Sequence, residues 1–307
     1  MTRSTSVYIC LLVCLTCFAA PAISNRDEEF DPRKIFLTFP DCDATNEPSI
    51  QCMIEDTDCI QSAYNQVKKD KNETTVFFHG YRNNINVIPT SDIISAYCWR
   101  NISVIALLDW SLLGKGDLML VGNRTPKIGR IVASTFNSLN NKGYEMAKWH
   151  LVGHSMGAHI AGCVGTYSNF TFLHITGLDP GEGPFYSDLY KGCLINPKVA
   201  HFTDALYTDR GGYATPINVG SLNVYANTGA APQPGCCSSQ RNVHACSHIK
   251  AGQWYADIVR NETKYLAVKC VDCTVLPIYG YCKDNERIYF GPHVDTKTTG
   301  TYCLSID

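Results

Sequence analysis

The stretch Gly153-His154-Ser155-Met156-Gly157 decides the fold of this chain. The apolar run 149–152 precedes it, and a run of small, mostly apolar residues, 158–165, follows it. A strand, then Gly-x-Ser-x-Gly, then a helix is the setting of a nucleophile elbow, a turn too sharp for side chains beside the serine. An ordinary serine in a strand-to-helix turn is the alternative, against which both flanking runs argue. The pattern predicts that Ser155 stands clear of a sheet, over the positive end of a helix.

Residues 1–24 have the composition of a secretory signal peptide. Residues 7–20 are almost all apolar, Arg3 gives a weak positive start, and residues 20–24 are mostly small. An uncleaved anchor is the alternative, but this apolar run is shorter than the roughly 20 residues that span a membrane. No other stretch is long and apolar enough to cross one. We expect a secreted, extracellular protein whose residues 25–307 form one catalytic domain.

Charge and cysteine content agree with export. The 307 residues carry 26 Lys and Arg against 28 Asp and Glu, a formal net charge of −2, with no basic run. This balance excludes a nucleic-acid partner and gives no strong attraction to anionic membranes. Of 16 cysteines, three lie within residues 1–24, and the thirteen that remain indicate an oxidising compartment. Five Asn-x-Ser/Thr sites should lie on the surface if glycosylated: Asn72, Asn101, Asn123, Asn169 and Asn261.

We expect twelve of these thirteen cysteines to form six disulfides. Cys163 stands alone in the helix after the elbow, and we predict that it is a buried free thiol. Cys270 and Cys273 have the spacing of a metal knuckle, but disulfides are favoured in an exported chain. Connectivity does not follow from sequence, and pairing of Cys237 with Cys193 is one guess among several.

Short apolar strands alternate with helices along the chain, which indicates a mostly parallel sheet covered on both faces. We expect strands at 74–78, 102–108, 172–178, 202–207 and 222–225, helices at 118–139 and 249–259, and a β-rich segment from Cys270 onward. Active sites in such sheets lie at the carboxyl ends of the strands. His79, Ser155 and Asp179 each follow a predicted strand, so we expect them on one rim.

A serine hydroxyl becomes a nucleophile when a base takes its proton and an acid orients that base. The chain order serine, acid, histidine is that of the α/β-hydrolases. Asp179 is the candidate acid, and a turn aspartate before proline is its alternative. His248 is the candidate base, since Cys246 can pin its loop and a helix is expected to start just after it. The N–H groups of Met156 and Tyr81 are the candidate oxyanion donors.

These motifs make the chain resemble the pancreatic lipase family of secreted α/β-hydrolases. The resemblance runs from about residue 74 to 258. It includes Phe78-His79-Gly80-Tyr81, Leu108-Asp109-Trp110, Val152-Gly153-His154-Ser155-Met156-Gly157-Ala158-His159, Thr176-Gly177-Leu178-Asp179-Pro180, Tyr207-Thr208-Asp209, Ala231-Pro232-Gln233-Pro234-Gly235-Cys236 and Cys246-Ser247-His248. It implies an α/β-hydrolase fold, a triad of Ser155, Asp179 and His248, and oxyanion amides at Tyr81 and Met156.

Three departures from the full-length lipases refine this expectation. Only 59 residues follow His248, too few for the family's C-terminal β-sandwich domain. The lid falls between Cys236 and Cys246, and its nine intervening residues are too few and too polar for an amphipathic flap. Asn196 and Val199 stand where some members have acidic calcium ligands, so we expect neither a metal nor another cofactor.

A short lid, no second domain and extra cysteines resemble the secreted phospholipases A1 of insects, including venom enzymes. The resemblance implies a monomeric enzyme that cleaves the sn-1 acyl ester of phospholipids at a membrane or micelle surface. The alternatives are a neutral triacylglycerol lipase or galactolipase and, on the same fold, a non-catalytic lipid-binding or yolk-type protein. Both elbow glycines and all three candidate triad residues are present, which argues against the last of these.

Overall fold

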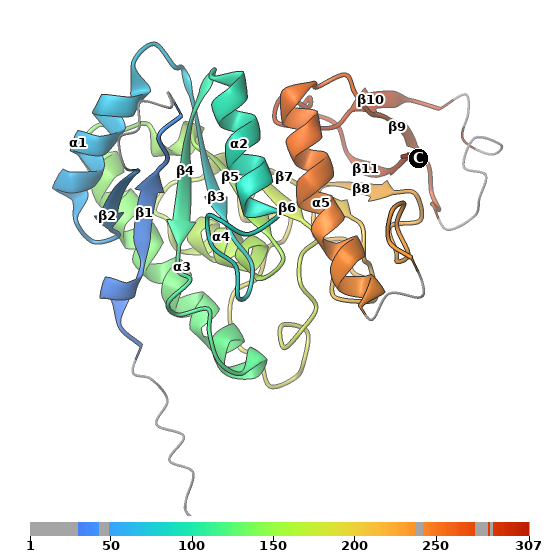
Figure 1. Cartoon of the computed structure of the whole chain (residues 1–307), viewed down its shortest axis with the longest axis horizontal. Helices are drawn as coiled ribbons and strands as arrows, with labels where there is room; N and C mark the ends of the chain where they lie inside the picture. Colours follow the sequence, from blue (N-terminus) through green and yellow to red (C-terminus); the bar gives the residue numbers. More distant parts are fainter. Residues whose placement is uncertain (1–29, 43–48, 238–241, 274–281, 283–284, 307) are drawn as a thin grey trace, which may run out of the picture. The chain divides into compact units, whose positions relative to one another are not determined.

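An eleven-stranded sheet forms the centre of the fold in a computed structural model that describes residues 30–306, apart from 43–48, 238–241, 274–281 and 283–284 (Figure 1). The predicted signal peptide, 1–24, lies outside the described residues. In sheet order the strands are β10 (Arg287–Tyr289), β9 (Leu266–Lys269), β11 (Gly300–Leu304), β8 (Leu222–Ala226), β7 (Ala200–Tyr207), β6 (Phe172–Leu178), β5 (His150–His154), β3 (Glu73–Phe78), β4 (Ser103–Asp109), β1 (Phe36–Phe39) and β2 (Ile50–Met53).

Seven neighbouring strands of the sheet pair in parallel, in the order β11, β8, β7, β6, β5, β3 and β4. Antiparallel pairs extend the sheet at both edges, through β9 and β10 at one edge and β1 and β2 at the other. The chain lays β4 on one side of β3 and then returns to lay β5 on the other side, followed outward by β6, β7 and β8. Ligand sites of open parallel sheets lie at the carboxyl ends of the strands, where the strand order reverses. The elbow after β5 stands at this reversal.

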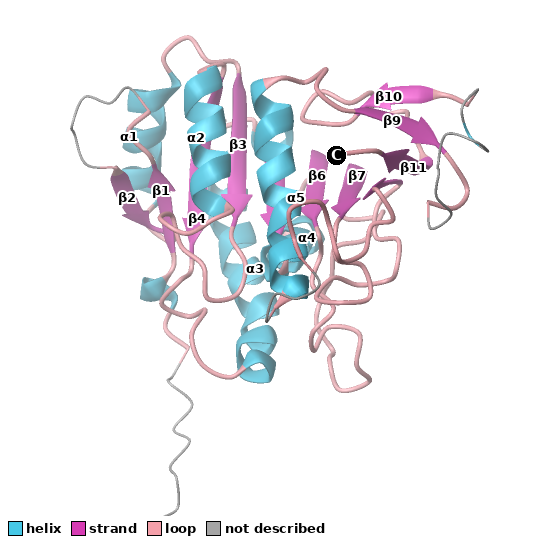
Figure 2. Cartoon of the chain, turned by 45° about the vertical axis from the view of Figure 1, so that its right-hand side comes forward, coloured by secondary structure: helices cyan, strands magenta, loops and turns pink. Residues whose placement is uncertain are grey.

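Helices cover both faces of the sheet. They are α1 (Thr57–Lys68), α2 (Thr90–Arg100), α3 (Leu118–Asn141), α4 (Met156–Tyr167) and α5 (Val243–Arg260), with short 3₁₀ helices at Pro32–Lys34 and Met146–Lys148. Figures 1 and 2 show α2 and α5 side by side across one face, and α3 packs with α4 across the other. A Cβ added at Gly129 of α3 would lie 2.3 Å from the Cβ of Cys163 on α4, so these helices approach as closely as glycine permits.

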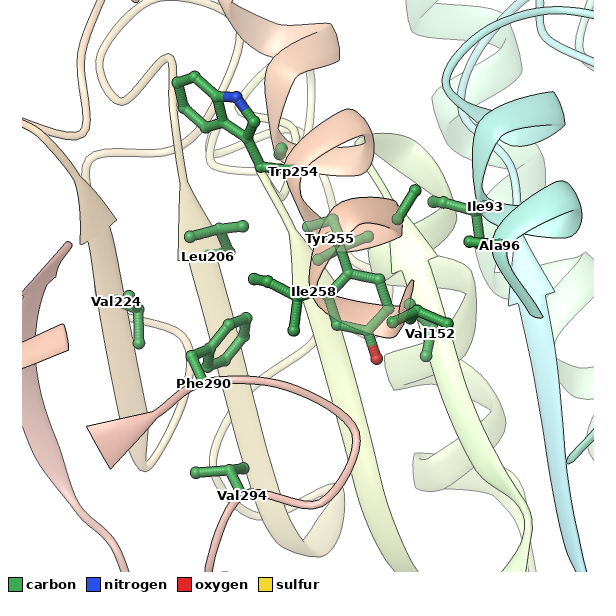
Figure 3. Close-up of a cluster of buried hydrophobic side chains, with 14 of the residues drawn as sticks. Ile93, Ala96, Val152, Leu206, Val224, Trp254, Tyr255, Ile258, Phe290 and Val294 are labelled. Carbon is green, nitrogen blue, oxygen red and sulfur yellow. The ribbon is translucent and has the colours of Figure 1, made fainter. Parts of the chain in front are cut away.

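A large hydrophobic core lies between the sheet and the helices α2 and α5. Figure 3 shows Tyr255 and Ile258 of α5 directed toward Val152, Leu206 and Val224 on the strands beneath them. These strand residues are all fully buried, as expected for parallel strands covered on both faces. The core therefore fixes α5, which carries His248, against the strands that end at the candidate site.

The predicted order of strands and helices is confirmed, and β6 has the predicted bounds of 172–178. The start of α5 differs. This helix begins at Val243, six residues before the predicted 249, because the side chain of Asn242 caps it by accepting from the N–H of Ala245 at 2.9 Å. Cys246 and His248 therefore lie within the helix, and not in the loop before it as predicted.

Six disulfides join twelve cysteines of the described chain, as expected in number. They are Cys42–Cys98, Cys52–Cys59, Cys163–Cys193, Cys236–Cys246, Cys270–Cys282 and Cys273–Cys303. The prediction that Cys270 and Cys273 form disulfides is confirmed. The prediction that Cys163 is a free thiol is wrong, as is the pairing of Cys237 with Cys193. A Cβ at Gly162 would lie 2.4 Å from the backbone of Ile195, so the segment carrying Cys193 passes directly over Cys163.

The free thiol belongs instead to Cys237, which is exposed. The five asparagines of the Asn-x-Ser/Thr sites are also exposed, as expected of residues available for glycosylation. Among the described helices, none combines the length and the apolar character that crossing a bilayer requires.

Candidate active site

Ser155 occupies a strained turn between β5 and α4, with φ +56° and ψ −124°. A side chain at either flanking glycine would collide with backbone. A Cβ at Gly153 would lie 2.5 Å from the backbone of Ala158, and one at Gly157 would lie 2.1 Å from the carbonyl oxygen of Phe78. Both glycines are therefore required by close approach, and the turn that they permit presents Ser155 at the end of the sheet.

Asp179 follows β6 directly and is fully buried. Its backbone has φ +47°, and its N–H donates to the carbonyl oxygen of Leu206 at 2.7 Å. Its Oδ1 accepts from the backbone N–H groups of Thr208 at 2.7 Å and Asp209 at 3.0 Å. Its Oδ2 lies 2.6 Å from Nδ1 of His248. Three hydrogen bonds thus fix the orientation of this carboxyl group.

The bond to Asp179 makes Nδ1 of His248 the donor, which leaves Nε2 as the atom able to accept a proton. His154, the neighbour of Ser155, places this ring beside the elbow. The two imidazole rings lie 4.6 Å apart, and Nε2–H of His154 donates to the carbonyl oxygen of His248 at 3.0 Å. Burial, followed by the proximity of His248, lowers the pKa of His154 to about 3, so His154 stays neutral and serves as a donor.

The loop after β3 lies against the elbow. A Cβ at Gly80 would lie 3.0 Å from the Cβ of Ser155, so glycine lets the backbone that leads to the amide of Tyr81 approach the serine. Met156 begins α4, where the first N–H groups have no partner within the helix. A Cβ at Gly181 would lie 3.6 Å from Oγ of Ser155 and 3.5 Å from the amide nitrogen of Met156. Glycine at 181 therefore keeps a side chain away from both atoms.

His79 and Trp110 brace this loop from behind. Their rings stack with centroids 5.0 Å apart and 3° between the planes. The indole Nε1–H of Trp110 donates to the carbonyl oxygen of His79 at 3.0 Å, and the backbone N–H of Trp110 donates to Nε2 of His79 at 3.2 Å. Nδ1–H of His79 then donates to the carbonyl oxygen of Gly80 at 2.8 Å. Both rings are fully buried, which fixes the backbone before Tyr81.

A second aspartate–histidine pair lies beside the first, and sequence reasoning missed it. Nδ1 of His244 lies 2.8 Å from Oδ1 of the fully buried Asp209, whose Oδ2 accepts from the N–H of Tyr213 at 2.7 Å. His244 and His248 lie four residues apart on α5, on the same face of the helix. This spacing was the available signal, but it has meaning only if the helix begins before His244.

The Cys236–Cys246 disulfide closes the segment predicted as the lid, with 5.7 Å between the Cα atoms. Residues 238–241 of this segment lie outside the described residues. At its two ends, Cys237 is exposed and Asn242 caps α5. The bond therefore fastens the predicted lid to the helix that carries His248.

One group of three potential metal ligands occurs among the described residues. Ligand atoms of Asp179, Asp209 and His248 lie within 4.8 Å of one another. The first and third already share the 2.6 Å hydrogen bond, which a cation would have to break. Asn196, at one of the positions matched to calcium ligands, hydrogen-bonds within its own turn. Its Nδ2 donates to the carbonyl oxygen of Leu194, and its Oδ1 accepts from the N–H of Lys198. The expectation of no metal stays a prediction.

The sequence model of the lipase family matches residues 19–300. The chain belongs to the lipase family. The match covers most of the chain, including every candidate site residue, and the observed sheet and its covering helices give this lipase-family member an α/β-hydrolase fold.

Individual relatives agree with this assignment. The chain is 32% identical to pancreatic triacylglycerol lipase of Mus musculus over 164 residues, which cover 47% of this chain and 35% of that protein. It is 26% identical to lipase member H of Oryctolagus cuniculus over 267 residues, 76% of this chain and 58% of that protein. It is 28% identical to pancreatic lipase-related protein 2 of Mus musculus over 53% of this chain and 38% of that protein. The matches thus span about a third to three fifths of these lipase-family proteins.

Proposed function

We propose that this protein is a secreted phospholipase A1, a carboxylic ester hydrolase that releases the sn-1 fatty acid of phospholipids. The observation that carries the chemistry is the buried Asp179–His248 pair at 2.6 Å, which packs against His154, the residue before a serine in the strained elbow conformation. This arrangement is the one that serine hydrolases use to activate a hydroxyl group. Membership of the lipase family makes a lipid ester the natural substrate class.

In the proposed reaction, Oγ of Ser155 attacks the ester carbonyl carbon while Nε2 of His248 takes the hydroxyl proton. The tetrahedral oxyanion accepts hydrogen bonds from the N–H groups of Met156 and Tyr81. The glycerol oxygen leaves with the proton from His248, and an acyl–Ser155 ester remains. A water molecule then attacks this ester and gives a proton to His248, the bond from the acyl carbon to Oγ of Ser155 breaks, and Oγ takes that proton as the fatty acid departs. Asp179 holds the ring in the required tautomer throughout.

The choice of phospholipid rests on the segment between Cys236 and Cys246. Its nine residues are mostly polar and are tied at both ends by a disulfide to α5 and the preceding loop. Nine residues are too few to form a long amphipathic flap, and a short, mostly polar segment suits a polar headgroup better than an apolar triglyceride. The triacylglycerol lipases among the relatives support the second candidate, a neutral lipase.

The loop after β4 and the start of α3 supply an apolar rim for a lipid surface. Leu112, Leu118 and Met119 are 46%, 40% and 43% exposed. A Cβ at Gly183 would lie 3.8 Å from a methyl group of Leu118, and Gly183 lies two residues after Gly181, the neighbour of Ser155. Exposed apolar side chains at the mouth of a site are suited to a membrane or micelle.

Labelling with a serine-reactive phosphonate tests the catalytic assignment. We expect one label, on Ser155, and we expect Ser155→Ala to lose both the label and about 10⁶-fold in kcat on a soluble ester. Ser138→Ala, at an exposed serine of α3, is the matched control and should keep both. A folded Ser155→Ala variant that keeps substantial activity would reject the mechanism. Absence of labelling and of hydrolysis in the wild-type protein would instead favour the non-catalytic, lipid-binding alternative.

A further inference from the structure

The two side chains of the His244–Asp209 pair differ sharply in their exposure to solvent. The carboxylate is fully buried, whereas the side chain of His244 is 51% exposed. Asp209 holds Nδ1 at 2.8 Å, so Nε2, on the opposite side of the ring, is turned away from the carboxylate. No hydrogen bond to Nε2 occurs within the part of the chain that the structure describes. The pair therefore fixes an imidazole whose second nitrogen is available to a ligand.

Tyr213 connects this imidazole to the candidate triad. Its ring lies 6.2 Å from that of His244, near-parallel at 28°, and 5.7 Å from that of His248, edge to face at 75°. Its hydroxyl and the side-chain amide of Asn242 exchange hydrogen bonds, which tie it to the start of α5. The rings of His244, Tyr213 and His248 thus lie in a row, and the ring of His248 lies against that of His154, the residue before Ser155.

We propose that Nε2–H of His244 binds the phosphodiester group of a phospholipid whose sn-1 ester lies at Ser155. The proposal rests on the proposed function and names the residue that would select its substrate. Side chains four residues apart on a helix have Cβ atoms about 5–6 Å apart. The glycerol unit that separates the sn-1 ester from the phosphate has a similar length.

The charges around His244 suit an anion. When the ring carries two protons, Asp209 accepts from Nδ1–H on the buried side and the outward Nε2–H is a charge-assisted donor. The first turn of α5 adds the partial positive charge of a helix N-terminus. Triacylglycerol carries no anionic group, and its ester carbonyl oxygens form weaker hydrogen bonds with this donor than a charged phosphodiester oxygen does. The pair therefore favours phospholipid over neutral lipid.

The test compares two short-chain substrates below their micellar concentrations, dihexanoylphosphatidylcholine and dihexanoylglycerol, with purified full-length protein. The measured quantity is the ratio of kcat/KM for phospholipid to kcat/KM for the neutral ester. His244→Gln should lower this ratio about tenfold, the loss expected for one hydrogen bond to a charged group. His201→Gln, at an exposed histidine on the amino end of β7, is the matched control and should leave the ratio unchanged.

Equal losses on both substrates would overturn the proposal, because they would show that His244 only supports the position of His248. An unchanged ratio in a folded His244→Gln variant would overturn it as well. The wild-type rates report separately on the proposed function. If the wild-type protein hydrolyses dihexanoylglycerol but not the phospholipid, phospholipase A1 activity and the headgroup contact are rejected together. If the wild-type protein hydrolyses the phospholipid well and His244→Gln leaves the ratio unchanged, only the headgroup contact is rejected.

Discussion

Asp179→Asn tests the geometry of the site through the tautomer of His248. Asparagine has nearly the size of aspartate, and its Oδ1 can keep accepting from the N–H groups of Thr208 and Asp209. Its amide group would then face Nδ1 of His248, where the carboxylate oxygen now lies at 2.6 Å. Because an amide N–H2 donates, the ring would have to accept at Nδ1 and carry its proton on Nε2. A protonated Nε2 cannot take the proton of Ser155.

The expected loss follows from two contributions. A hydrogen bond to a charged group contributes about 1.5–3 kcal/mol, and full burial of Asp179 places it at the upper end of that range. The wrong tautomer adds to this loss, and in serine hydrolases the combined effect of such a change is about 10⁴-fold in kcat. We therefore expect kcat to fall about 10³–10⁴-fold, equivalent to about 4–5.5 kcal/mol, with little change in KM.

The assay is hydrolysis of a soluble short-chain ester, combined with nitrogen NMR of the imidazole ring to report its tautomer. Asp188→Asn, at an exposed aspartate, removes the same charge from the surface and should keep wild-type kcat. Thermal unfolding of both variants checks that they are folded. If Asp179→Asn keeps a tenth or more of the wild-type kcat, Asp179 does not orient His248, and the neighbouring carboxylate of Asp209 becomes the acid to test.

Three further predictions concern packing, pH and the lipid surface. Gly157→Ala should destabilise the fold by about 1–3 kcal/mol in urea unfolding, because its Cβ would lie 2.1 Å from the carbonyl oxygen of Phe78; unchanged stability would mean that the elbow is looser than described. A hydrogen bond to Glu73, and then, against the effect of burial, one to Glu262, raise the pKa of His293 from 6.5 to about 9. The contribution of His293 to stability is therefore complete below about pH 6.5 and is lost as pH rises through 9. His293→Gln should remove this part of the decline of the thermal midpoint with pH, and an identical decline in the variant would contradict the pairing. Replacing both Leu118 and Met119 by Ser should lower the rate of phospholipid vesicle hydrolysis several-fold relative to the rate on a soluble ester. Leu173→Ser, at a leucine that is 49% exposed at the amino end of β6, should leave this ratio of rates unchanged. The same ratio of rates in both variants would place the lipid-binding surface elsewhere.

Much of the architecture could be predicted because strong local patterns carry it. The elbow glycines at 153 and 157 need glycine for steric reasons that are visible in the pentapeptide, and the structure gives the clashes. The runs 74–78 and 172–178 are rich in β-branched and aromatic residues, and all of their residues except Leu173 are buried, as expected of strands covered on both faces. Because parallel strands end at one edge, the residues that follow them could be placed together before any contact was known.

The errors concern contacts that depend on tertiary packing. Cys163 looked isolated because its partner, Cys193, lies thirty residues away in a loop with no regular pattern. The first turn of α5 has no apolar periodicity and is fixed by the Asn242 cap, so its start could not be placed from hydrophobic spacing. Without that turn, the relation between His244 and Asp209 had no basis in the sequence.

The measurement that tests the central proposal most directly is hydrolysis, by the purified secreted protein without calcium, of phosphatidylcholine and triolein that are each labelled by acyl position. A secreted phospholipase A1 predicts release of the sn-1 chain from phosphatidylcholine, little release of the sn-2 chain and little release from triolein. Strong hydrolysis of triolein, or release of the sn-2 chain as the first product, would contradict it.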